Sequence, residues 1–115
     1  MQTDIPDLSA IEEQALLLSQ AAIGLDQARA GARDAHKLAT ALEANLEVWV
    51  GIRAVIDGPD CGVETAVCDN LRRLCDFIAG STFKHGINMT DSTINTLINI
   101  NFQISEGLLE GAKRR

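Results

Sequence analysis

The chain has 115 residues, a length that suits one domain with a single hydrophobic core. Its formal net charge of −6 and isoelectric point near 4.7 would repel a phosphate backbone, so direct binding of nucleic acid is disfavoured. Hydrophobic residues make up 46% of the chain but aromatic residues only 3%, which favours packed helices over a β-sandwich. We therefore predict an all-α fold in which residues 1–115 form a single domain.

The N-terminal segment has no recognisable targeting signal. Residues 1–10 are acidic and lack the basic and apolar regions of a secretory signal peptide. No apolar run in the chain approaches the roughly 20 residues that cross a bilayer. We expect a soluble, cytoplasmic protein without membrane contact, and we expect residues 1–8 to be a flexible lead-in to the first helix.

The first two predicted helices have clear boundary signals. Ser9-x-x-Glu12 forms a capping box for the first helix, with Asp7 as the alternative cap. Its core stripe consists of Ile11, Ala15, Leu18, Ala22 and Leu25. The second helix is predicted to run from near Asp34 to about Ile56, because an Asp-Gly-Pro sequence follows and stops it. Its inward positions are Leu38, Leu42, Leu46, Trp49, Ile52 and Ile56.

The first predicted helix also carries a second apolar face. Leu16 and Ile23 lie about 120° to 140° away from the core stripe, whereas a bundle helix needs only one apolar face. The second face is either a wide core contact or a docking surface, and the helical spacing is compatible with both. We predict a partner-binding site here, with Leu17 or Gln20 at its margin.

Two further helices complete the predicted antiparallel bundle of about four helices. The third spans roughly Val63 to Ala79 and is followed by a loop from Gly80 to Met89. Its inward positions are Val63, Val67, Leu71, Leu74 and Ile78. The fourth helix is capped by Thr90 or Asp91 and ends near Gly111. Its apolar half consists of Ile94, Leu97, Ile98, Ile100, Phe102, Ile104, Leu108 and Leu109.

Two asparagines fall in the middle of apolar stripes. Asn45 interrupts the second helix and Asn101 interrupts the fourth. An unpaired buried amide would cost about 1 to 3 kcal/mol, so we expect both to be buried and hydrogen-bonded to each other or to the backbone. Trp49, one turn beyond Asn45, should be largely buried as the only large aromatic residue available to the core.

The cysteines and histidines do not form a recognisable catalytic or metal site. Three cysteines recur every seven residues, at Cys61, Cys68 and Cys75. This helical spacing separates the thiols by about 10 Å, too far for one tetrahedral zinc ion. His36 in Ala35-His36-Lys37-Leu38 resembles the phosphoacceptor of histidine phosphotransfer domains. Those domains have a Lys three residues after the His, followed by a Gly, and here these two positions hold Ala39 and Thr40. We predict no catalytic activity, metal or cofactor.

Three segments together resemble the FlaF family of flagellin-biosynthesis regulators. The first is Asn45 with Trp49, and the second runs from Asn70-Leu71-x-x-Leu74 to Thr82. The third, near the C-terminus, contains Leu97, Ile98, Ile100, Asn101, Ile104, Gly107 and Leu108. Their order and spacing fit the family from about Glu12 to Leu108, whereas the first ten residues do not obviously follow it.

The resemblance implies a role in coupling flagellin production and export to flagellar assembly. Such a protein would bind flagellin as an export chaperone does, or act with FlbT, the partner regulator of flagellin message. The acidic charge and the lack of catalytic motifs favour protein contact over contact with mRNA. We therefore predict a flagellin-binding protein with FlbT as a second candidate partner. A phosphotransfer module using His36 and an oligomeric scaffold are the alternatives, and the sequence leaves homodimer formation open.

Overall fold

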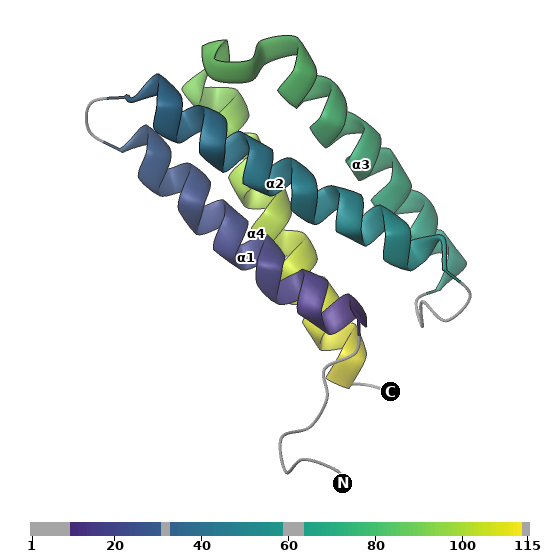
Figure 1. The fold of residues 1–115 in the computed structure, drawn as a ribbon. Helices are drawn as coiled ribbons and strands as arrows, with labels where there is room; N and C mark the ends of the chain where they lie inside the picture. The colour runs from purple at the N-terminus through teal and green to yellow at the C-terminus, as the bar shows by residue number, and fades with distance from the viewer. Residues whose placement is uncertain (1–9, 31–32, 59–63, 114–115) are drawn as a thin grey trace, which may run out of the picture.

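The computed structural model describes residues 10–30, 33–58 and 64–113, which form a helical bundle (Figure 1). Its α-helices are α1 (Ala10–Arg29), α2 (Ala35–Ile56), α3 (Thr65–His85) and α4 (Asp91–Lys113), and the 3-10 turn η1 (Gly86–Asn88) joins the last two. The described residues contain no strand. The predicted all-α bundle of four helices is confirmed. The predicted flexible lead-in and the caps at Asp7 and Ser9 lie outside the described residues.

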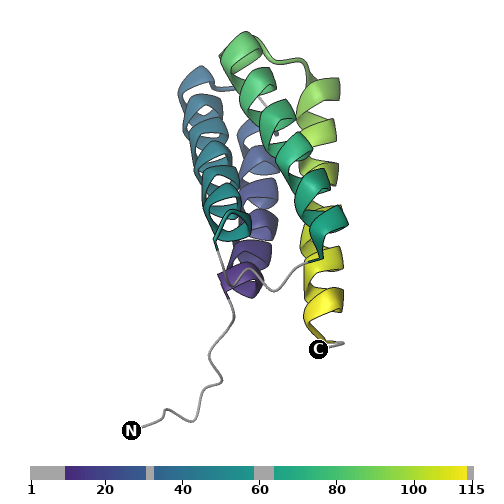
Figure 2. The same ribbon diagram turned by 90° about the vertical axis from the view of Figure 1, so that its right-hand side faces the viewer.

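The four helices pack unequally. The closest backbone approaches pair α1 with α4, α1 with α2, and α2 with α3. Figures 1 and 2 show α1 flanked by α2 and α4, with α3 across the bundle from α1. The two helices at opposite ends of the described chain, α1 and α4, are therefore direct neighbours, whereas α1 and α3 are not.

Side chains at the predicted positions cap α2 and α4. The Asp34 carboxylate accepts the backbone N–H groups of His36 at 2.9 Å and Lys37 at 3.2 Å, which satisfies two of the free donors in the first turn of α2. The Thr90 hydroxyl accepts the N–H of Thr93 at 3.1 Å and caps α4. The same end of the bundle is held by arginines: Arg29 donates to the Asn95 side chain at 3.1 Å, and Arg33 donates to the Met89 carbonyl.

We expect the Asp34 cap to make stability depend on pH. The backbone hydrogen bonds from Lys37 and His36 lower the pKa of the Asp34 carboxyl below its ordinary value. A lowered pKa means that the carboxylate stabilises the fold above the unfolded-state pKa, and that this contribution is lost as pH falls through the folded-state pKa. Asp34→Asn, which keeps a neutral cap, should lower the melting temperature by a few degrees at pH 7. Thermal unfolding followed by circular dichroism should show this difference shrinking below about pH 4. A difference that stays constant with pH would contradict this assignment.

The prediction that α3 ends at Ala79 and is followed by a loop from Gly80 to Met89 is wrong. The helix continues through Gly80 to His85 and passes directly into η1. It ends where Gly86 adopts a φ of 50°, a left-handed conformation that glycine accepts readily, and the Gly86 N–H bonds to the Thr82 carbonyl. Gly86 therefore ends the helix. Gly80 does not, because it occupies an exposed position at which a helix tolerates glycine.

Several predicted core positions also need correction. Val67 is 36% exposed, and Leu46 and Leu74 are only half-buried. In α3 the buried positions are instead Cys68, Leu71, Cys75 and Ile78. The buried face of α3 includes the two cysteines and not Val67, because the edge of the helix that carries the cysteines packs against α2. Phe102 in α4 is 42% exposed, although its position within the apolar half of the helix predicted burial. Val63 lies outside the described residues.

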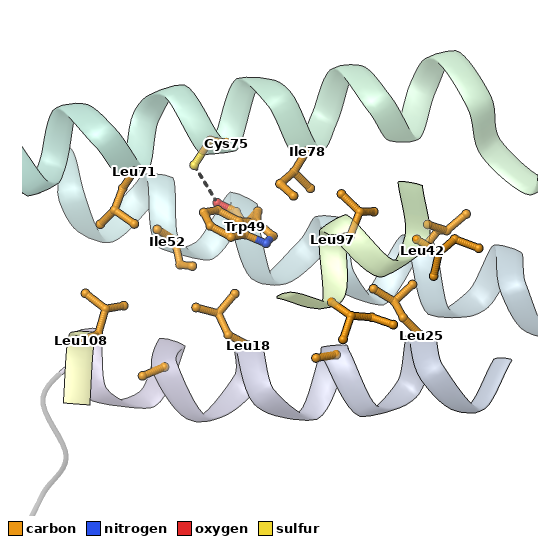
Figure 3. Packing of buried hydrophobic residues seen from close by; sticks show 14 of the residues in the cluster. Leu18, Leu25, Leu42, Trp49, Ile52, Leu71, Cys75, Ile78, Leu97 and Leu108 are labelled. Atoms are coloured by element: carbon orange, nitrogen blue, oxygen red, sulfur yellow. Dashed lines mark hydrogen bonds between the residues drawn. The ribbon is translucent and has the colours of Figure 1, made fainter. Parts of the chain in front are cut away.

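The core is centred on Trp49. The indole is only 1% exposed, which confirms the predicted burial. Figure 3 shows the ring between side chains of α1, α3 and α4, with Leu18 and Ile78 on different sides of it. The predicted stripe of α1 is confirmed throughout, since each of its members is buried: Ile11, Ala15, Leu18, Ala22 and Leu25. A single large ring thus fills the space that the aliphatic residues of the bundle leave at its centre.

Candidate functional site

A buried amide layer ties three helices together beside Trp49. The Asn101 Nδ2 group donates to Asn45 Oδ1 at 2.6 Å and to the Leu18 carbonyl at 3.1 Å. The Trp49 Nε1–H donates to Asn101 Oδ1 at 3.0 Å. Both asparagines are completely buried, which confirms the predicted pairing. Because Trp49 can only donate and a carbonyl can only accept, these contacts fix the orientation of the Asn101 amide.

A second polar contact lies one turn along α4 from Asn101. The Ser105 hydroxyl donates to the Ala15 carbonyl at 2.6 Å and accepts a hydrogen bond from the Ser19 hydroxyl at 2.8 Å. Ser105 is 2% exposed. Together with Asn101, this contact joins the α4 side chains to two backbone carbonyls of α1. Both the register and the rotation of α4 against α1 are therefore fixed, and with them the residues that α4 presents to solvent.

An apolar surface lies outside this polar contact, and we call it the α1–α4 face. It contains a shallow hollow of about 380 Å³ between the two helices. The hollow is lined by Ser19, Phe102, Gln103, Ser105, Glu106 and Leu109. Ser19 is three residues after Leu16 and four before Ile23, so both side chains lie on the same side of α1 as Ser19. Leu16 is 44% exposed, Ile23 49% and Phe102 42%, and of these three apolar side chains Phe102 lines the hollow itself.

All four residues predicted for partner binding are exposed, but they do not form one patch. Gln20 lies between Leu16 and Ile23 on the same face of α1. Leu17 is 41% exposed but lies on the opposite edge of α1, nearer to α2, because successive helical residues are about 100° apart. Two interpretations of the second apolar face were open, a wide core contact and a docking surface. The exposure of Leu16 and Ile23 in the bundle excludes the wide core contact. Phe102 belongs to the face and was missed because its α4 stripe was counted as core.

The buried thiol of Cys75 has an environment that disfavours reactivity. Cys75 is buried, and its thiol donates to the Trp49 carbonyl at 3.5 Å, as Figure 3 shows. Burial raises the pKa of this thiol, which disfavours the reactive thiolate. Cys68 is buried as well, and Cys61 lies outside the described residues. Within the described ranges no three His, Cys, Asp or Glu side chains come together as a metal site would require.

His36 occupies an exposed position in the first turn of α2. Its backbone N–H is bound by the neighbouring Asp34 carboxylate, and its backbone carbonyl accepts the Thr40 hydroxyl at 3.0 Å. Three and four residues after His36, α2 has Ala39 and Thr40, where a phosphotransfer domain has its Lys and Gly. The Asp34 carboxylate, which accepts the His36 backbone N–H, also places a negative charge near this residue, which is unfavourable for an incoming phosphoryl group.

In the part of the chain that the structure describes, no helix has the length and apolar character needed to cross a membrane.

The fold and the α1–α4 face define a small all-α bundle with an amide-locked core and an exposed apolar hollow. The sequence carries a family signature that is consistent with this architecture. The chain belongs to the flagellar protein FlaF family, whose model matches residues 3–108. The match begins closer to the N-terminus than the resemblance from about Glu12 indicated, so most of the first ten residues belong to the family region. No curated protein matches the chain, and no solved structure matches it.

Proposed function

We propose that this protein binds flagellin through the α1–α4 face and so couples flagellin production to export and flagellar assembly. Membership of the FlaF family supports a flagellar role. The observation that carries the binding proposal is the exposure of Leu16 and Ile23 on the same side of α1 as Ser19, which lines the hollow together with the exposed Phe102 of α4. Their helices are locked together by Asn101 and Ser105, so the face is formed before a partner arrives.

The dimensions and chemistry of the face suit an amphipathic helix. A partner helix can lay its apolar side along the line from Leu16 to Ile23, and one of its side chains can enter the hollow beside Phe102. The floor of the hollow offers the Ser19 and Ser105 hydroxyls, which are already bonded to each other. Of the residues that line the hollow, only Glu106 is charged, so we expect salt to change the affinity little.

Contact with protein accounts for the proposed regulatory role without any catalytic step. The net charge of −6 disfavours direct contact with flagellin mRNA, so we propose that an effect on the message passes through FlbT as a second protein partner. A cytoplasmic location follows from this role. The phosphotransfer alternative through His36 is not favoured by any observation beyond the exposure of its side chain.

The proposal is tested by charging the α1–α4 face. Leu16→Asp combined with Ile23→Asp should leave the far-UV circular dichroism spectrum unchanged, because both side chains are outside the core. Calorimetric titration with purified flagellin should show affinity reduced at least tenfold, or about 1.4 kcal/mol, since two apolar contacts are replaced by buried carboxylates.

A matched control is available on the same helix. Leu17→Asp changes a similarly exposed leucine on the other edge of α1 and should affect binding less than threefold. If the Leu16 and Ile23 variant binds flagellin as tightly as the parent, the site lies elsewhere. If Leu17→Asp is equally damaging, the partner approaches from the α2 side and the α1–α4 face is the wrong surface.

A further inference from the structure

A second apolar surface lies on the opposite side of the bundle, between α2 and α3. We call it the α2–α3 face. It contains a hollow of about 360 Å³ whose floor is formed by Trp49 and Cys75. Its apolar rim carries Leu46, Val50, Ala54 and Ala79. Val50 is 62% exposed, and Phe83, one helical turn beyond Ala79 on the same edge of α3, is 79% exposed. No other large apolar side chain among the described residues is as exposed as these two.

The charged side chains near the seam, where α2 and α3 meet, fall into two groups. The first group is already paired across the seam: Arg53 lies 3.4 Å from Asp76, and Arg72 lies 3.0 Å from Asp57. The second group lies at the outer margins. On α2 it consists of the exposed Glu43 and Glu47, and on α3 of the exposed Arg73 and Lys84. Within the described part of the chain, these four side chains form no ion pair.

The unpaired charges make the face complementary to itself. Its α2 margin is acidic and its α3 margin is basic, so any arrangement that places α2 of one copy on α3 of another pairs opposite charges. A two-fold axis parallel to the helices does this while keeping every residue at the same height along the bundle. Because α2 and α3 are antiparallel, with Arg53 opposite Asp76, the position of Glu43 corresponds in height to that of Lys84.

We propose that the protein forms a symmetric homodimer through the α2–α3 face. Each copy places Phe83 on the α2 helix of the other copy, close to the height of Glu43, and each Glu43 pairs with Lys84 of the second copy. Val50 becomes buried near the axis. The rim charges set the orientation of the two copies, and the apolar side chains supply most of the affinity. The α1–α4 face is on the opposite side, so both copies keep it accessible.

Sedimentation equilibrium over a range of micromolar concentrations tests the dimer. The parent chain should show a monomer–dimer equilibrium, and Val50→Glu combined with Phe83→Glu should raise the dissociation constant at least tenfold. Leu16→Asp, on the opposite side of the bundle, is the matched control and should leave the constant unchanged. A parent chain that remains monomeric up to about 1 mM, where the binding free energy is only about −4 kcal/mol, would overturn the proposal.

A charge reversal tests the orientation of the dimer. Glu43→Lys alone and Lys84→Glu alone should each weaken the dimer several-fold, because each places two like-charge pairs at the interface. The double variant should restore the parental dissociation constant to within threefold. Both side chains are exposed, so the variants should fold, which circular dichroism can verify. A double variant that is weaker than either single variant would overturn this arrangement, as would a dimer that none of these changes affects. Flagellin binding that depends on Val50 and Phe83 would assign the face to a different occupant.

Discussion

Replacing Trp49 by alanine is expected to destabilise the protein by about 3 to 5 kcal/mol, a large part of the stability of a domain of this size. The indole is 1% exposed and lies at the centre of the core, so its removal leaves a cavity that several helices would have to close. It also removes the only donor that contacts Asn101 Oδ1 among the described residues. Urea unfolding followed by circular dichroism measures the effect without relying on tryptophan fluorescence.

The Trp49→Phe variant separates the two causes. Phenylalanine keeps most of the apolar volume but lacks the N–H group, so it should cost about 1 to 3 kcal/mol for the unsatisfied Asn101 oxygen and a smaller cavity. If Trp49→Ala and Trp49→Phe are equally destabilising, the hydrogen bond dominates over packing. If Trp49→Ala costs less than about 1 kcal/mol, the core must be able to collapse around the missing ring, and the central role of Trp49 is wrong.

The two buried asparagines should differ strongly in their effect on stability. Asn101→Leu removes the centre of the amide layer and leaves both the Trp49 N–H and the Asn45 amide without partners. Each unsatisfied buried group costs about 1 to 3 kcal/mol, so for the two groups together we expect a total loss of about 2 to 6 kcal/mol. Asn45→Leu should cost less than about 1 kcal/mol, because Asn101 keeps its bond to Leu18 and the Asn45 Nδ2 group already has no hydrogen-bond partner in the described structure.

Chemical denaturation of both variants gives this comparison directly. Asn99→Leu, at an exposed position on α4, controls for the helix propensity of leucine and should lie within about 0.5 kcal/mol of the parent. Equal losses for Asn45→Leu and Asn101→Leu would mean that the amides act as one inseparable pair. A stabilised Asn101→Leu variant would show that the layer selects the helix register at the expense of stability, as some buried polar groups do.

Parts of this structure follow from sequence because the local signals and the packing agree. The capping residues Asp34 and Thr90 precede helices whose apolar periodicity starts immediately after them. The pairing of Asn45 with Asn101 was predictable because two buried amides on separate helices satisfy each other more readily than either does alone. Trp49 was predictable as core since no other residue of the chain has its apolar area.

Other features depend on the tertiary arrangement and could not be predicted from the sequence. The apolar and small residues of α3 allow two rotations, and contact with α2 selects the one that buries Cys68 and exposes Val67. The end of α3 was uncertain because Gly80 and Gly86 are both stop signals, and only Gly86 adopts the left-handed conformation. Phe102 lies at the edge of the α4 apolar half, where rotation of the helix by Ser105 and Asn101 decides between burial and exposure.

The pairing of α1 with α4 has a consequence for the order of events during synthesis. These helices are separated by two others in the chain, yet they pack closely and share the hydrogen bonds of Asn101 and Ser105 with α1 carbonyls. A nascent chain can form α1, α2 and α3 as they emerge, but the Leu18 and Ala15 carbonyls receive these bonds only after α4 has left the ribosome. The hollow beside Phe102 is made by the same two helices. A nascent chain whose α4 has not yet emerged therefore has no α1–α4 face, and it can compete for a partner there only after α4 has packed on α1.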